Sequence, residues 1–74
     1  MSPELEVLAL VDRIKPLLAG QERAYQGAAL AELLSLWLAG HPPEVRESVL
    51  VAHIEAVRGL TRVNARALRG ELWQ

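Results

Sequence analysis

The stretch that decides the fold spans residues 36–44 and reads Leu-Trp-Leu-Ala-Gly-His-Pro-Pro-Glu. Gly40 is the residue type that most often ends a helix in the left-handed conformation, and the two prolines that follow closely cannot continue that helix. Pro43 and Glu44 then suit the first turn of a new helix, because proline needs no amide donor there and the acid faces the positive helix end. The stretch therefore predicts a sharp boundary between two helices.

Helices are predicted on both sides of this boundary. Residues 21–39 are rich in Ala and Leu, which are strong helix formers. Over residues 43–68, apolar side chains recur every three or four positions, which is the pattern of an amphipathic helix. Gly59 falls inside this longer segment, so the helix either continues through it or breaks there. Residues 70–74 are expected to form a short tail.

A third helix is predicted near the N-terminus, over residues 3–18. Ser2 is a good N-cap, and Pro3 suits the first helical position. Apolar residues at helical spacing follow. Pro16 removes one backbone hydrogen bond, so the helix either kinks or ends early at that point.

The whole chain, residues 1–74, is predicted to be one all-α domain, a small antiparallel bundle of three helices. The chain is 51% hydrophobic and 23% charged, which is typical of a folded soluble domain, and cytoplasmic localisation is the expectation. The absence of cysteine excludes disulfides, thiolate zinc sites and thiol catalysis. No segment alternates with the two-residue period of a strand.

A homodimer is expected because a bundle this small is marginally stable without disulfides or a metal. The segment 21–39 also has apolar residues on more than one face, and the segment 43–68 is longer than either neighbour. Surplus apolar surface of this kind is commonly covered by a second copy. The residues predicted to take part in self-association are Tyr25, Ala29, Leu36 and Trp37.

Three polar residues fall on the apolar side of the segment 43–68, namely Arg46, His53 and Asn64. One interpretation is a polar pocket or metal site centred on His53, which would make the protein a ligand- or metal-binding module. The other is that these side chains find partners across a helix crossing and fix register or oligomeric state. His41 is expected to cap or pack on Trp37, and the twelve-residue spacing predicts that it lies roughly 18 Å from His53 along a continuous helix.

Charge is divided unevenly along the chain. Residues 1–57 carry eight acidic and four basic side chains, whereas residues 58–74 carry four arginines and one glutamate. The arginines step by four, four and three positions, so they share one helix face. This face is interpreted as a solvated surface, as a contact for an acidic protein partner or the acidic half of a second copy, or as a nucleic-acid contact. The stripe comprises Arg58, Arg62, Arg66 and Arg69.

No catalytic arrangement is recognisable. The serines lie in no nucleophile motif, the glycines form no phosphate-binding loop, and no pair of acids is forced together by spacing. The function expected from the sequence is a non-enzymatic helical module for protein–protein interaction that self-associates and needs no cofactor. A nucleic-acid-associated regulator and a metal- or ligand-binding module are the alternatives.

Overall fold

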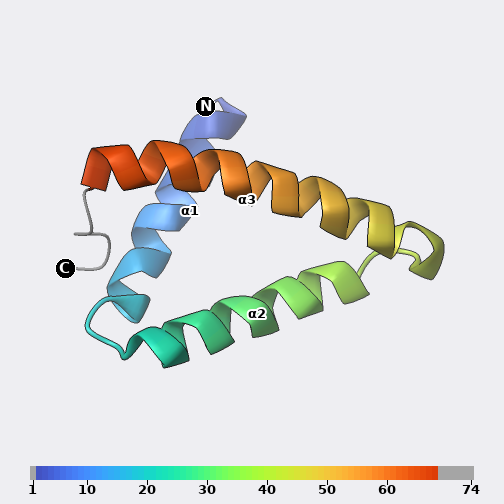
Figure 1. Cartoon of the computed structure of the whole chain (residues 1–74), viewed down its shortest axis with the longest axis horizontal. Coiled ribbons are helices and arrows are strands. Elements are labelled where there is room, and N and C mark those ends of the chain that lie inside the picture. Colours follow the sequence, from blue (N-terminus) through green and yellow to red (C-terminus); the bar gives the residue numbers. More distant parts are fainter. Residues whose placement is uncertain (1, 69–74) are drawn as a thin grey trace.

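The protein is all-α in a computed structural model that describes residues 2–68 (Figure 1). Helix α1 spans Pro3–Leu18, α2 spans Arg23–Ala39, and α3 spans Arg46–Leu68. A single 3-10 turn, η1 (Pro43–Val45), leads into α3. The three predicted helices are confirmed. The predicted tail at 70–74 lies outside the described residues.

Helix α1 begins at the residue that the sequence predicts and continues through Pro16. The Leu5 amide donates to the Oγ of Ser2 at 3.3 Å, which satisfies one of the free donors of the first turn. The helix continues past Pro16 and ends at Leu18. Gly20 follows with a φ of +83°, a conformation that glycine adopts at little cost. Because this turn occupies residues 19–22, α2 starts two residues later than predicted.

The end of α2 differs in one respect from the prediction. Gly40 is right-handed, with a φ of −73°, so the expectation of a left-handed C-cap there is wrong. The helix instead tightens into 3-10 bonds, in which Gly40 donates to the Trp37 carbonyl and His41 donates to the Leu38 carbonyl. The prolines that follow then stop the helix.

Helix α3 is continuous through Gly59, which settles the choice between a continuous and a broken helix. A Cβ placed on Gly59 would find only the Nη2 atom of Arg62 within 4.0 Å, so this glycine is not required by close packing. With 23 residues, α3 is the longest element.

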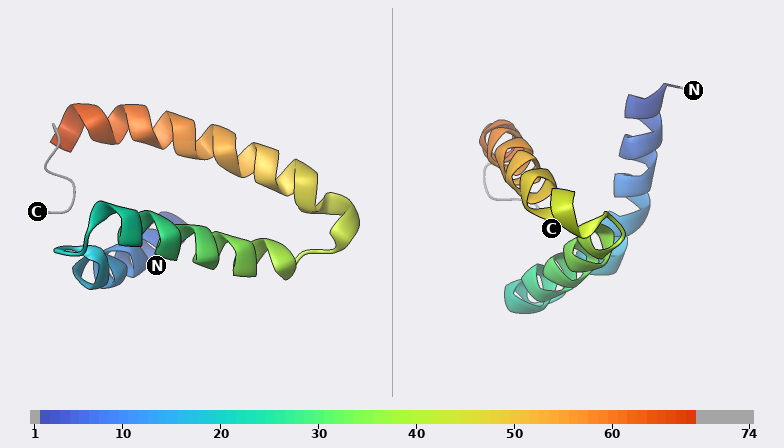
Figure 2. Two further views of the ribbon diagram at one scale, coloured as in Figure 1. Left: turned by 60° about the horizontal axis from the view of Figure 1, so that its bottom comes forward. Right: turned by 90° about the vertical axis from the view of Figure 1, so that its right-hand side faces the viewer.

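The three helices form an open arrangement. Helices α2 and α3 meet at the turn between them and diverge away from it, and α1 stands apart from α3 (Figure 2). Among residues 2–67, Leu18 is the only apolar residue that is buried, with 8% of its surface exposed. The prediction of a closed antiparallel bundle is therefore not confirmed for a single chain.

The accessible surface area agrees with this open arrangement of the helices. The chain exposes 6348 Å², whereas a compact monomer of 8.1 kDa exposes about 4,500 Å². Its radius of gyration is 13.8 Å, against about 11 Å for a compact domain of this length. One chain alone thus leaves a surplus of about 1,800 Å² in contact with water.

Candidate self-association surface

Large apolar side chains are exposed on all three helices. The exposed residues on α1 lie mainly along one stripe, because they recur every three or four positions. Further exposed leucines and valines lie on α2 and α3. Exposed apolar surface of this extent on a small protein makes these helix faces a candidate interaction surface. The exposed leucines, valines and isoleucines include Leu5, Val7, Leu8, Leu10, Ile14 and Leu17 on α1, Leu30, Leu33 and Leu36 on α2, and Val51, Val57, Leu60 and Val63 on α3.

The corner between α1 and α2 is the best-packed part of the described chain. The Nε2 of Gln26 donates to the Leu18 carbonyl oxygen at 2.8 Å, and the Gln26 side chain is only 5% exposed. This bond satisfies one of the free carbonyls at the end of α1. Gln26 therefore ties the end of α1 to the first turn of α2.

The sequence pattern did not reveal this role of Gln26. The available signal was position, since Gln26 lies one turn into a helix that follows a short connection. A long amide side chain there can reach back to the carbonyls that end the preceding helix.

Trp37 forms the junction between α2 and α3. Its indole meets the imidazole of His41 edge-on at 4.8 Å between centroids, and that of His53 at 5.1 Å with a tilt of 46°. The Nδ1 of His41 also donates to the Trp37 carbonyl oxygen at 3.0 Å. The expectation that His41 caps or packs on Trp37 is confirmed.

The predicted separation of about 18 Å between His41 and His53 is wrong, because both imidazoles flank the same indole. The estimate assumed one continuous helix from His41 onward. In the structure His41 lies in the turn before η1, and it folds back onto the end of α2.

The predicted polar set of Arg46, His53 and Asn64 is brought together only in part. Arg46 donates from Nε to the His41 carbonyl at 2.9 Å and from Nη2 to the Ala39 carbonyl at 3.0 Å. It therefore caps the negative end of α2. His53 contacts Trp37 nearby, whereas Asn64 is exposed and lies eleven residues, or about 16 Å, farther along α3.

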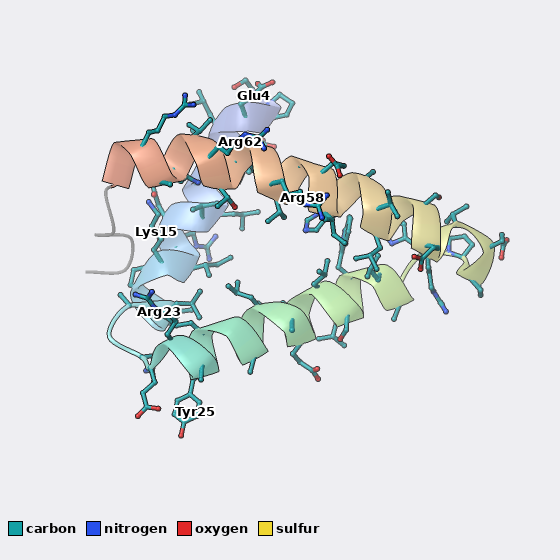
Figure 3. The ribbon with its side chains drawn as sticks, viewed as in Figure 1. Glu4, Lys15, Arg23, Tyr25, Arg58 and Arg62 are labelled. Atoms are coloured by element: carbon teal, nitrogen blue, oxygen red, sulfur yellow. The ribbon has the colours of Figure 1, made fainter. Side chains whose placement is uncertain are left out.

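The residues predicted to take part in self-association divide into two groups. Tyr25, Ala29 and Leu36 are exposed, and Figure 3 shows Tyr25 pointing away from α3. Trp37 instead sits between α2 and α3, with 48% of its surface still exposed.

The arginine stripe lies along α3, where Arg58 and Arg62 are labelled in Figure 3. Arg58 donates to the Oε1 of Glu55 at 2.8 Å in an exposed ion pair within the helix. Arg62 and Arg66 are exposed, and Arg69 lies outside the described residues. The three arginines of the stripe that the structure describes are thus exposed, and Arg58 has an acidic neighbour in Glu55.

Residues 2–68 contain neither a metal-binding cluster nor a membrane-spanning helix. No cluster of three or more histidine, cysteine, aspartate or glutamate side chains in this range is arranged to hold a metal ion. Within the same range, no helix has the length and apolar character needed to cross a membrane.

Comparison with known proteins adds no relative, since no protein-family model, no curated protein and no solved structure matches the chain.

Proposed function

We propose that the protein is a non-enzymatic helical interaction module that self-associates as a homodimer. The observation that carries the proposal is the surplus of about 1,800 Å² of accessible surface over that of a compact monomer. A standard protein–protein interface takes only about 800 Å² from each partner. Two chains that each bury this surplus would bury about 3,600 Å² in total, which is in the range of about 2,000–5,000 Å² for obligate homodimers.

The chemistry of the surface supports the same proposal. The exposed large apolar side chains are mainly leucine and valine, and obligate dimer interfaces resemble a domain core cut in half. A second copy is the favoured partner because closed twofold homodimers are the commonest oligomers. It also requires no other component. In this proposal folding and association are coupled, since a single chain buries too little apolar surface to offset its lost conformational entropy.

Sedimentation equilibrium between about 1 and 100 μM chain tests the proposal directly. We expect the mass of a dimer, with a melting temperature that rises with chain concentration. Leu60→Lys should weaken the dimer, because Leu60 is 60% exposed in one chain and would be covered in the dimer. Ala65→Lys on the charged side of the same helix is the matched control. A monomer throughout this range, folded and with an unchanging melting temperature, would exclude self-association.

A further inference from the structure

The apolar stripe on α1 is exposed within its own chain. Val7 and Leu10 are 57% and 55% exposed, and Ile14 is also exposed. The hydrogen bond from Gln26 to Leu18 ties the end of α1 to α2, and α1 stands apart from α3 (Figure 2). The stripe therefore needs cover from outside the described part of its own chain.

A stripe of similar length and character lies on the C-terminal half of α3. Ala56, Leu60 and Val63 share one face of the continuous helix, and all three are exposed. Both stripes have members at three- and four-residue spacing, so their side chains can interdigitate in a helix pair.

We infer that α1 of one copy lies antiparallel along the C-terminal half of α3 of a second copy, an inference that rests on the proposed homodimer. In an antiparallel pair, each step forward along α1 is a step backward along α3. One register then aligns all three positions of each stripe. The pairs in this register are Val7 with Val63, Leu10 with Leu60, and Ile14 with Ala56.

The charges that flank the two stripes agree with this register. Glu6 and Arg13 lie on one flank of the α1 stripe, and Arg66 and Glu55 lie on the α3 flank that an antiparallel pair brings against them. Measured along the helix axes, the Cα atoms of Glu6 and Arg66 then differ in height by about 3 Å. Those of Arg13 and Glu55 differ by the same amount. Both pairs are attractive, and electrostatic complementarity of this kind selects orientation and partner.

A parallel pairing on the same half of α3 has the opposite electrostatics. It brings the other flank of α1 against the same α3 residues, which places Glu4 beside Glu55 and Lys15 beside Arg66. A closed three-helix bundle with short turns would run α1 parallel to the α3 of its own chain. The flanking charges therefore disfavour closure within one chain and favour the α1 of a second copy.

Cysteine cross-linking tests the register, because the chain has no native cysteine. The single variants Leu10→Cys and Leu60→Cys are mixed, allowed to exchange and oxidised, so that any disulfide between the two positions joins two chains. We expect a covalent dimer, since opposite residues of a helix pair meet the limit of about 7 Å between Cα atoms. Val49→Cys mixed with Leu10→Cys is the matched control, because position 49 lies about 16 Å from position 60 along α3.

Charge reversal provides a test that does not depend on oxidation. Glu6→Arg and Arg66→Glu each create two repulsive contacts in a twofold dimer, so each variant alone should self-associate roughly fivefold more weakly at low salt. Mixing the two variants restores both contacts in the heterodimer. Native mass spectrometry should therefore find heterodimer well above the share that random exchange gives. A random share would overturn the inference.

The outcomes separate this inference from the proposed function. If the chain sediments as a dimer but the Leu10→Cys and Leu60→Cys variants form no joint disulfide, the register is wrong and the homodimer stands. If the chain is a monomer, both fail. A double Leu10→Cys, Leu60→Cys variant that closes a disulfide within one chain would overturn the inference in favour of a folded-back α1.

Discussion

The indole of Trp37 on α2 and the imidazole of His53 on α3 lie 5.1 Å apart between ring centroids, at a tilt of 46°. This contact joins the two helices near the turn that connects them, and it is the reason that a histidine can sit on the apolar side of α3. Aromatic pairs of this geometry contribute about 0.5–1.5 kcal/mol beyond the area that they bury.

His53→Ala should therefore lower the free energy of unfolding by about 1 kcal/mol. Asn64→Ala is the control from the same predicted polar set, and it should change stability by less than about 0.5 kcal/mol because Asn64 is exposed. Urea unfolding at one fixed chain concentration measures both. Equal losses for the two variants would contradict the assignment of His53 to the junction.

Arg46→Ala should destabilise the turn between α2 and α3. The variant loses two hydrogen bonds to the carbonyls of Ala39 and His41, together with a positive charge at the end of α2. We expect a loss of about 1–2 kcal/mol, seen as a lower melting temperature at equal chain concentration. Arg46→Lys keeps the positive charge but lacks the planar guanidinium that donates both hydrogen bonds. Its melting temperature should therefore lie between those of the parent chain and the alanine variant. A lysine variant no better than alanine would show that the charge contributes nothing.

Gln26→Leu should destabilise the corner between α1 and α2 by about 1 kcal/mol, although it keeps the side chain's bulk. The Leu18 carbonyl would lose one of its two donors and keep the amide of Gln21. Chemical denaturation checks the loss, with Gln21→Ala as the control, since the Gln21 side chain is exposed. If Gln26→Leu were as stable as the parent chain, the corner would be held by packing alone.

Two glycines should respond to alanine with opposite signs. Gly20→Ala forces a side chain into a φ of +83° and should cost about 1 kcal/mol. Gly59→Ala replaces a glycine inside α3 where a Cβ meets no closer atom than Arg62 Nη2 at 4.0 Å, and should gain about 1 kcal/mol. Thermal unfolding followed by circular dichroism measures both shifts. A loss at Gly59 would mean that another chain packs closely there.

The helices were predictable from the sequence because their signals are local. Ser2 and Pro3 define the start of α1, and the two prolines after Gly40 define the boundary before α3. Each signal acts through the backbone within about one helical turn. The handedness of Gly40 was predicted wrongly because two 3-10 bonds ended α2 before a left-handed residue was needed.

Side-chain contacts outside the regular helices were predictable from the sequence only where the two residues are close along the chain. His41 was expected to cap or pack on Trp37 and does both, because the two residues are four apart. The tie from Gln26 to Leu18 depends on the path of the turn between them, which the sequence pattern does not specify. Asn64 was grouped with Arg46 and His53 by its helix face, but it is exposed and lies about 16 Å beyond His53 along α3.

The exposed stripe on α1 has a consequence for the lifetime of a newly made chain. Until a second copy covers them, Val7, Leu10 and Ile14 present the kind of apolar segment on which chaperones and proteases act. In the proposed dimer, the fraction of chains protected in this way grows with their own concentration. The half-life of the protein in a cell would then depend on its expression level, and a modest fall in synthesis would lower its abundance more than proportionally.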